Sequence, residues 1–136
     1  MGISRIGTAT MKPEFIYKNP SPVNRGYQDS FIRAVAIIEN RSWESVYKDL
    51  CRLGLRMAES PQDGNVWKCY LQNHGTGPEV QLTYSHITVG EFSKNHPDST
   101  WILKLGEGWV TCCIEGTIYD ARNYKNKLVQ KAYKIR

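Results

Sequence analysis

The hydrophobic period of this chain changes once, near residue 98. Before that point the apolar residues recur mainly at helical spacing, whereas from Ser99 onward they alternate with polar residues. A period near 3.6 is typical of helices and a period of 2 is typical of half-buried strands. The sequence therefore predicts an α+β fold, with N-terminal helices packed on a C-terminal antiparallel sheet. A chain of 136 residues fits one such domain.

Two helices are expected in the first half of the chain. The segment 29–40 is almost wholly apolar, which is typical of a helix buried on all sides, and Asp29 or Ser30 can cap its first turn. The segment 42–58 restarts a helix with Ser42 as its cap. Its apolar residues recur at helical spacing and are expected in the core: Trp43, Val46, Tyr47, Leu50, Leu53 and Met57.

Two shorter helices are expected next, at 65–75 and 88–96. Thr88 with Glu91 three residues later forms the pattern of a capping box, and Pro97 ends the second of these helices. His74 and His96 fall where these helices end, so a role at the helix C-terminus is the simplest interpretation of both.

Four strands are predicted at 99–105, 109–114, 117–121 and 128–135, where β-branched and aromatic residues alternate with others. Glu115-Gly116 is short enough to join the second and third strands as a hairpin. The last strand is expected at an edge of the sheet, with its lysines protecting that edge from pairing with other chains.

The ends of the chain differ in charge from its body. Residues 1–28 carry four basic and one acidic side chain, residues 121–136 carry six basic and none acidic, and residues 29–120 have eight basic and twelve acidic side chains. We expect residues 1–25 to form an extended basic arm and 26–136 to form the single domain. Basic ends attract phosphate or an acidic protein surface, although charge governs encounter more than function.

Several functional classes are excluded by simple counts. Four cysteines occur without zinc-ligand spacing, so neither a metal nor another cofactor is expected. The neighbours Cys112 and Cys113 should point to opposite faces of their strand and act as small apolar residues. No signal peptide and no run of about 18 apolar residues occurs, so we expect a cytoplasmic protein that does not enter a membrane.

Three segments resemble the papain-like cysteine peptidases, in particular the small single-domain proteins of phages and bacteria. NRGYQDSFIRAVAIIENRSWESVYKDL (24–50) is similar to the opening in which a nucleophilic cysteine starts a buried helix. TVGEFSKNHPDSTWILKL (88–105) looks like the helix and strand that precede the catalytic histidine, and GWVTCCIEGTIYDA (108–121) looks like the hairpin that carries it. The resemblance implies the papain-like fold and, for a phage protein, the host cytoplasm.

The two residues that perform the chemistry of that family are replaced in this chain. The resemblance places Ser30 at the nucleophile position and Trp109 at the histidine position, while Asp120 fits the orienting role and Gln28 is a remnant of an oxyanion-side group. Tryptophan offers one N–H donor and cannot act as a base. We therefore expect a pseudoenzyme that binds a protein partner, and for a phage protein the partner would be a host factor.

Two alternatives remain open at this stage. A weak hydrolase would use Ser30 with a displaced histidine such as His86, although a serine at a helix start is more often a cap. Alternatively, the basic termini with their tyrosines would bind nucleic acid.

Trp109 itself either fills the closed cleft or forms a half-exposed anchor for a partner. On the second interpretation the partner-binding residues would be Trp109, Arg122, Lys125 and Lys131.

Overall fold

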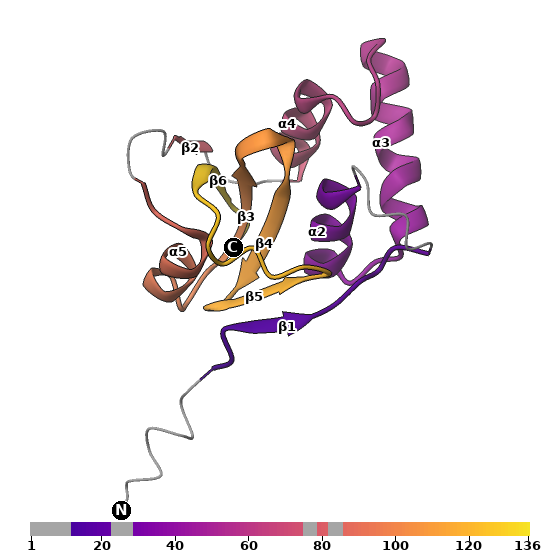
Figure 1. The fold of residues 1–136 in the computed structure, drawn as a ribbon. Coiled ribbons are helices and arrows are strands. Elements are labelled where there is room, and N and C mark those ends of the chain that lie inside the picture. The colour runs from indigo at the N-terminus through magenta and orange to yellow at the C-terminus, as the bar shows by residue number, and fades with distance from the viewer. Residues whose placement is uncertain (1–11, 23–28, 75–78, 82–85) are drawn as a thin grey trace, which may run out of the picture.

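The computed structural model of the chain describes residues 12–22, 29–74, 79–81 and 86–136 (Figure 1). Four helices and six strands form an α+β fold, as the change of period predicts. The helices are α2 (Ser30–Glu39), α3 (Trp43–Met57), α4 (Gly64–Asn73) and α5 (Val89–Asn95). The strands are β1 (Phe15–Tyr17), β2 (Glu79–Gln81), β3 (Thr100–Leu105), β4 (Val110–Ile114), β5 (Thr117–Asp120) and β6 (Val129–Lys134).

The sheet is mixed rather than purely antiparallel, so that part of the expectation was wrong. Its strand order is β1-β5-β4-β3-β6-β2, and β1 runs parallel to β5. The parallel strand belongs to the N-terminal arm, which lies beside β5 of the β4–β5 hairpin. The Lys12 ammonium donates to Pro97 O at 3.0 Å and to Glu115 O at 2.8 Å, which fixes the arm beside the β4–β5 turn.

The arm thus contributes a strand to the sheet, since Phe15, Ile16 and Tyr17 pair with Ile118, Tyr119 and Asp120. The boundary near residue 25 stays a prediction, because 23–28 lie outside the described residues.

Strand β6 is not at the edge, which corrects a second expectation. The three residues of β2 pair antiparallel with Lys131, Ala132 and Tyr133 of β6, so β2 occupies that edge. A three-residue strand has almost no periodicity, and its pairing is decided by tertiary contacts rather than by its own sequence.

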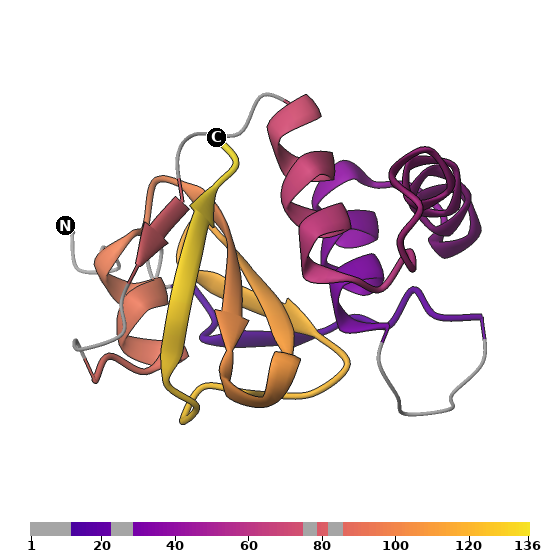
Figure 2. The same ribbon diagram turned by 90° about the horizontal axis from the view of Figure 1, so that it is seen from above.

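Helices cover both faces of the sheet (Figure 2). On one face α2, α3 and α4 enclose a core that includes Ile102, Val110 and Cys112 of the sheet. On the other face α5 and the segment after β5 cover a second core, which includes Cys113 and Ile118. The two neighbouring cysteines therefore lie in different cores, as strand alternation predicts.

Hydrophobic periodicity and capping residues predicted the positions of the helices well. In α2 every residue from Ser30 to Ile38 is buried, and α5 begins with the complete capping box of Thr88 and Glu91. The Ser42 side chain caps α3 by accepting from Ser45 N at 3.1 Å. Asp63 caps α4 in the same manner.

None of the helices in the described part of the chain is both long and apolar enough to cross a membrane.

Candidate functional site

The start of α2 lies against the start of β4. Ser30 Oγ accepts a hydrogen bond from Val110 N at 3.0 Å, and both residues are buried. Val110 directly follows Trp109 in the chain, but the two side chains pack in different cores, Val110 on the α2 side and Trp109 on the α5 side.

The expected cap of α2 is not formed, which is a third correction. Asp29 occupies the N-cap position, but its side chain makes no capping hydrogen bond. Ser30 is the first helical residue, and its hydroxyl bonds β4 instead of its own helix. The Asp29 carboxylate pairs with Arg33 and accepts from Trp43 Nε1 at 3.0 Å, so it joins α2 to α3.

Asp120, at the end of β5, belongs to the same site. Its Oδ1 accepts from Ala121 N at 2.6 Å and lies 3.5 Å from Arg33 Nε. Arg33 is thus a buried cation placed between two carboxylates, Asp29 and Asp120. Arg33 is the one charged residue between Asp29 and Glu39 in the sequence. Because a buried charge needs a partner, this isolated arginine is the sequence signal for the site.

Several buried polar atoms around Asp120 have no hydrogen-bond partner. They are Arg33 Nε, Thr111 Oγ1, Asp120 Oδ2 and Tyr124 Oη. Burial raises the pKa of the Asp120 carboxyl, while the nearby Thr111 and Arg33 oppose that rise. Burial and the Asp120 charge likewise raise the pKa of Tyr124. Unsatisfied buried groups are rare, so their gathering around one carboxylate marks this region as unusual.

Trp109 is half-buried and lies against the core that α5 covers. Its ring centroid is 5.6 Å from that of Tyr124, and the Arg122 guanidinium lies 5.9 Å from the Trp109 ring centroid. Arg122 is exposed. Trp109 therefore packs partly in the core, with an exposed arginine close to its ring, and both interpretations of its role stay predictions.

The three histidines have other surroundings. His74 Nδ1 donates to Tyr70 O at 2.8 Å and His96 Nδ1 donates to Phe92 O at 2.8 Å, each at the end of its own helix. His86 is exposed. Among the described residues, the one hydrogen bond of Ser30 Oγ is that from Val110 N.

The other residues predicted from the sequence do not gather at this site. Lys125 pairs with Glu14 of the arm at 3.5 Å, and Lys131 lies on β6 beside β2 and β3. Gln28 lies outside the described residues. Burial raises the pKa of Cys112, and it raises the pKa of Cys113 to about 12, so neither thiol is a ready nucleophile.

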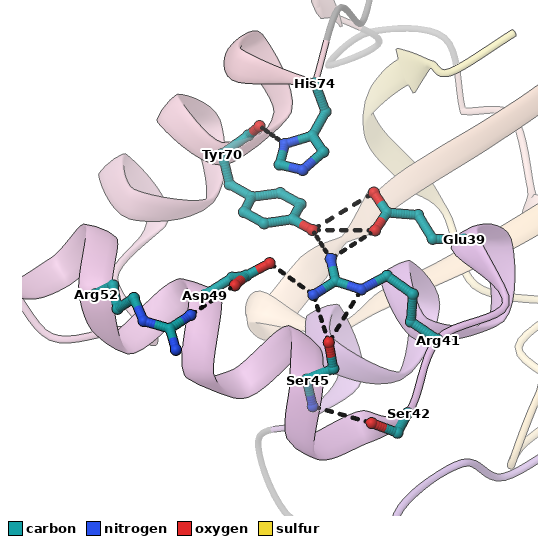
Figure 3. A network of polar contacts seen from close by, with 8 residues as sticks. All are labelled: Glu39, Arg41, Ser42, Ser45, Asp49, Arg52, Tyr70 and His74. Carbon is teal, nitrogen blue, oxygen red and sulfur yellow. Dashed lines mark hydrogen bonds and ion pairs between the residues drawn. The ribbon is translucent and has the colours of Figure 1, made fainter.

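A second polar network lies at the opposite end of α2 and was not foreseen (Figure 3). Arg41 donates to Glu39 at 2.9 Å, to Tyr70 Oη at 3.0 Å and to Asp49 at 2.6 Å, so it joins α2, α3 and α4. The hydrogen bond to Asp49 raises the pKa of Arg41, and burial raises that of Tyr70. The sequence signal for this network is Tyr70 at a buried helical position, because a buried phenol needs a hydrogen-bond partner.

No protein-family description, curated protein or solved structure matches this chain.

Removing the Ser30 hydroxyl should destabilise the fold. In Ser30→Ala the buried Val110 N–H loses its acceptor, which should lower the free energy of unfolding by about 1–3 kcal/mol. Ser93 is the comparison, because its side chain is also buried but accepts no hydrogen bond from a backbone N–H among the described residues. Urea unfolding should show a clear loss for Ser30→Ala and little change for Ser93→Ala. Equal losses would contradict the role of the Ser30 hydroxyl.

Titration of Asp120 should make the free energy of unfolding depend on pH. Since its folded-state pKa lies above the ordinary value of 3.8, its protonated form contributes stability at low pH that is lost as pH rises through the folded pKa. Asparagine cannot titrate. The free energy of unfolding of the wild type, minus that of Asp120→Asn, should therefore fall as the pH rises from below 3.8 through the folded-state pKa of Asp120. A difference that rises over this range would show that pairing with Arg33 outweighs burial.

Proposed function

We propose that this chain is a catalytically inactive protein of the papain-like type that works by binding another protein. The observation that carries the proposal is the contact between Ser30 Oγ and Val110 N at 3.0 Å. It ties the serine expected at the nucleophile position to the backbone of β4, next to the residue expected at the histidine position, and Arg33 links the same helix to Asp120.

The Ser30 hydroxyl and the Asp120 carboxylate already have structural contacts. The Ser30 hydroxyl accepts from a backbone N–H, and the Asp120 carboxylate pairs with Arg33 and Ala121 N. A serine needs a base far more than a cysteine does, because its hydroxyl is barely ionised near neutral pH. Trp109 cannot supply that base. His86, the displaced base of the hydrolase alternative, is exposed whereas Ser30 is buried, which disfavours that alternative.

Binding is supported by the side chains gathered at Trp109. Tryptophan, tyrosine and arginine are the residue types most enriched at the energetic centres of protein interfaces. Here the Tyr124 ring and the Arg122 guanidinium both lie near the Trp109 ring. Such contacts restrict the ring, and a restricted side chain loses less conformational entropy on binding. The resemblance adds that, for a phage protein, the partner would be a factor of the bacterial host.

The nucleic-acid alternative finds less support. Lys125 is paired with the arm residue Glu14, and Arg122 lies over Trp109. Lys134 is the last residue of β6, and the Arg136 guanidinium donates to Ile38 O at 3.4 Å near the C-terminal end of α2. Several basic residues of the C-terminal run therefore already contact other parts of the protein.

Reactivity should separate an inactive protein from a hydrolase. A fluorophosphonate that labels activated serines should leave the wild type unmodified, because among the described residues the hydroxyl of Ser30 bonds only to the backbone of Val110 and to no base. Labelling of the wild type that disappears in Ser30→Ala would establish the hydrolase.

Partner binding should depend on the surface around Trp109. Tagged wild-type protein should retain a partner from bacterial lysate, whereas Trp109→Ala and Arg122→Ala should lose it, typically by more than 1 kcal/mol of binding free energy each. Arg52→Ala is the control for lost charge, because Arg52 is an exposed arginine on α3 whose contact is to Asp49. Loss of the partner in all three variants, or in none, would argue against this surface.

A further inference from the structure

A pocket of about 200 Å³ lies far from Ser30, at the opposite end of α2. It is bounded by the ends of α2 and α4, by β3 and by the residues that follow β6. Its floor is entirely aliphatic, made by Val35, Ile38, Leu71, Ile102 and Ile135. Cavities of about 150 Å³ with such walls hold benzene, so this one has room for roughly six to eight non-hydrogen atoms.

Two polar side chains at the pocket are already engaged by the network of Arg41 (Figure 3). Glu39 accepts from Arg41 at 2.9 Å and from the Tyr70 hydroxyl at 3.2 Å, so its negative charge is compensated within the protein. His74 donates to Tyr70 O and its ring stacks on that of Tyr70, with centroids 3.9 Å apart. These contacts fix the shape of the pocket wall without requiring a ligand.

Arg136 is the remaining charge of the pocket. Its backbone is held by the sheet, because Thr100 N donates to Arg136 O and Ile135 N donates to Thr100 O, both at 2.8 Å. Its Nη2 donates to Ile38 O at 3.4 Å, which places the guanidinium at the C-terminal end of α2. A guanidinium carries five N–H donors, and among the described residues Arg136 forms no ion pair.

We propose that this pocket binds a small monocarboxylic ligand, whose apolar body fills the aliphatic floor and whose carboxylate pairs with Arg136. Arginine matches the planar geometry of a carboxylate and offers it two parallel N–H donors. The aliphatic floor favours a branched or cyclic hydrocarbon body of the size given above. A free carboxylic acid and the C-terminal residue of a polypeptide both have this chemistry. The proposal is independent of the function assigned to the Trp109 surface.

Methyl NMR titration of the full chain tests this pairing directly. The probe is 4-methylpentanoate, and 4-methylpentanamide is the matched neutral ligand of the same shape. The acid should shift the methyl signals of Val35, Ile38, Leu71, Ile102 and Ile135 saturably at millimolar concentrations. The amide should bind at least about tenfold more weakly, because it lacks the charge that Arg136 recognises.

Arginine substitutions test whether Arg136 causes the tighter binding of the acid than of the amide. Arg136→Gln should weaken binding of the acid about tenfold or more and leave binding of the amide unchanged. Arg122→Gln removes the same charge at the distant Trp109 surface and should leave both affinities unchanged. Thermal melting of each variant shows whether the fold is retained. If Arg136→Gln does not fold, Ile135→Phe, which fills the pocket from a half-buried position, replaces it and should abolish binding of acid and amide alike.

A last pair of probes identifies the source of the carboxylate. N-acetyl-leucine represents the end of a polypeptide, and N-acetyl-leucinamide is its neutral control. Tighter binding of N-acetyl-leucine than of 4-methylpentanoate supports a polypeptide terminus, and the reverse order supports a free acid. The proposal is overturned if no acid binds at millimolar concentration, if the amides bind as well as the acids, or if Arg136→Gln keeps the preference for the acids.

Discussion

The buried guanidinium of Arg33 organises the part of this fold that matters most. It lies in the first turns of α2, pairs with Asp29 at the start of the same helix and lies 3.5 Å from Asp120 at the end of β5. Removing one partner from such a buried arrangement leaves an uncompensated charge and typically costs about 3–5 kcal/mol. The arrangement therefore fixes the start of α2 relative to α3 and the sheet, and with it the position of Ser30.

The same contacts decide what the Asp120 carboxylate does in this fold. It faces the guanidinium of Arg33, a group that does not release its proton, and it accepts from Ala121 N. The unsatisfied polar atoms of Thr111 and Tyr124 are the remaining cost of keeping so many polar groups in one buried place.

Local sequence signals were sufficient for the helices and for the central strands, because periodicity, caps and turns act over only a few residues. They were insufficient wherever the partner is distant in sequence. Ser30 was expected to cap its own helix, but its hydroxyl bonds a residue 80 positions away. For the same reason β1 and β2 were not recognised as strands, and β6 was placed at the edge although β2 covers it. Ser30, Trp109 and Asp120 were identified through the resemblance, whereas the partner of Arg33 required the structure.

The two surfaces singled out by the structure lie at the two ends of α2, a ten-residue helix that spans about 15 Å. Each end is fixed by its own ionic contacts, Arg33 at the start and Glu39 with Arg41 near the end. Between them every side chain is buried, so substitutions along the helix are costly and offer no new surface. Variation in what this protein binds is consequently expected at the helix ends, where Trp109 and Arg136 are contributed by other segments and can change without disturbing the core.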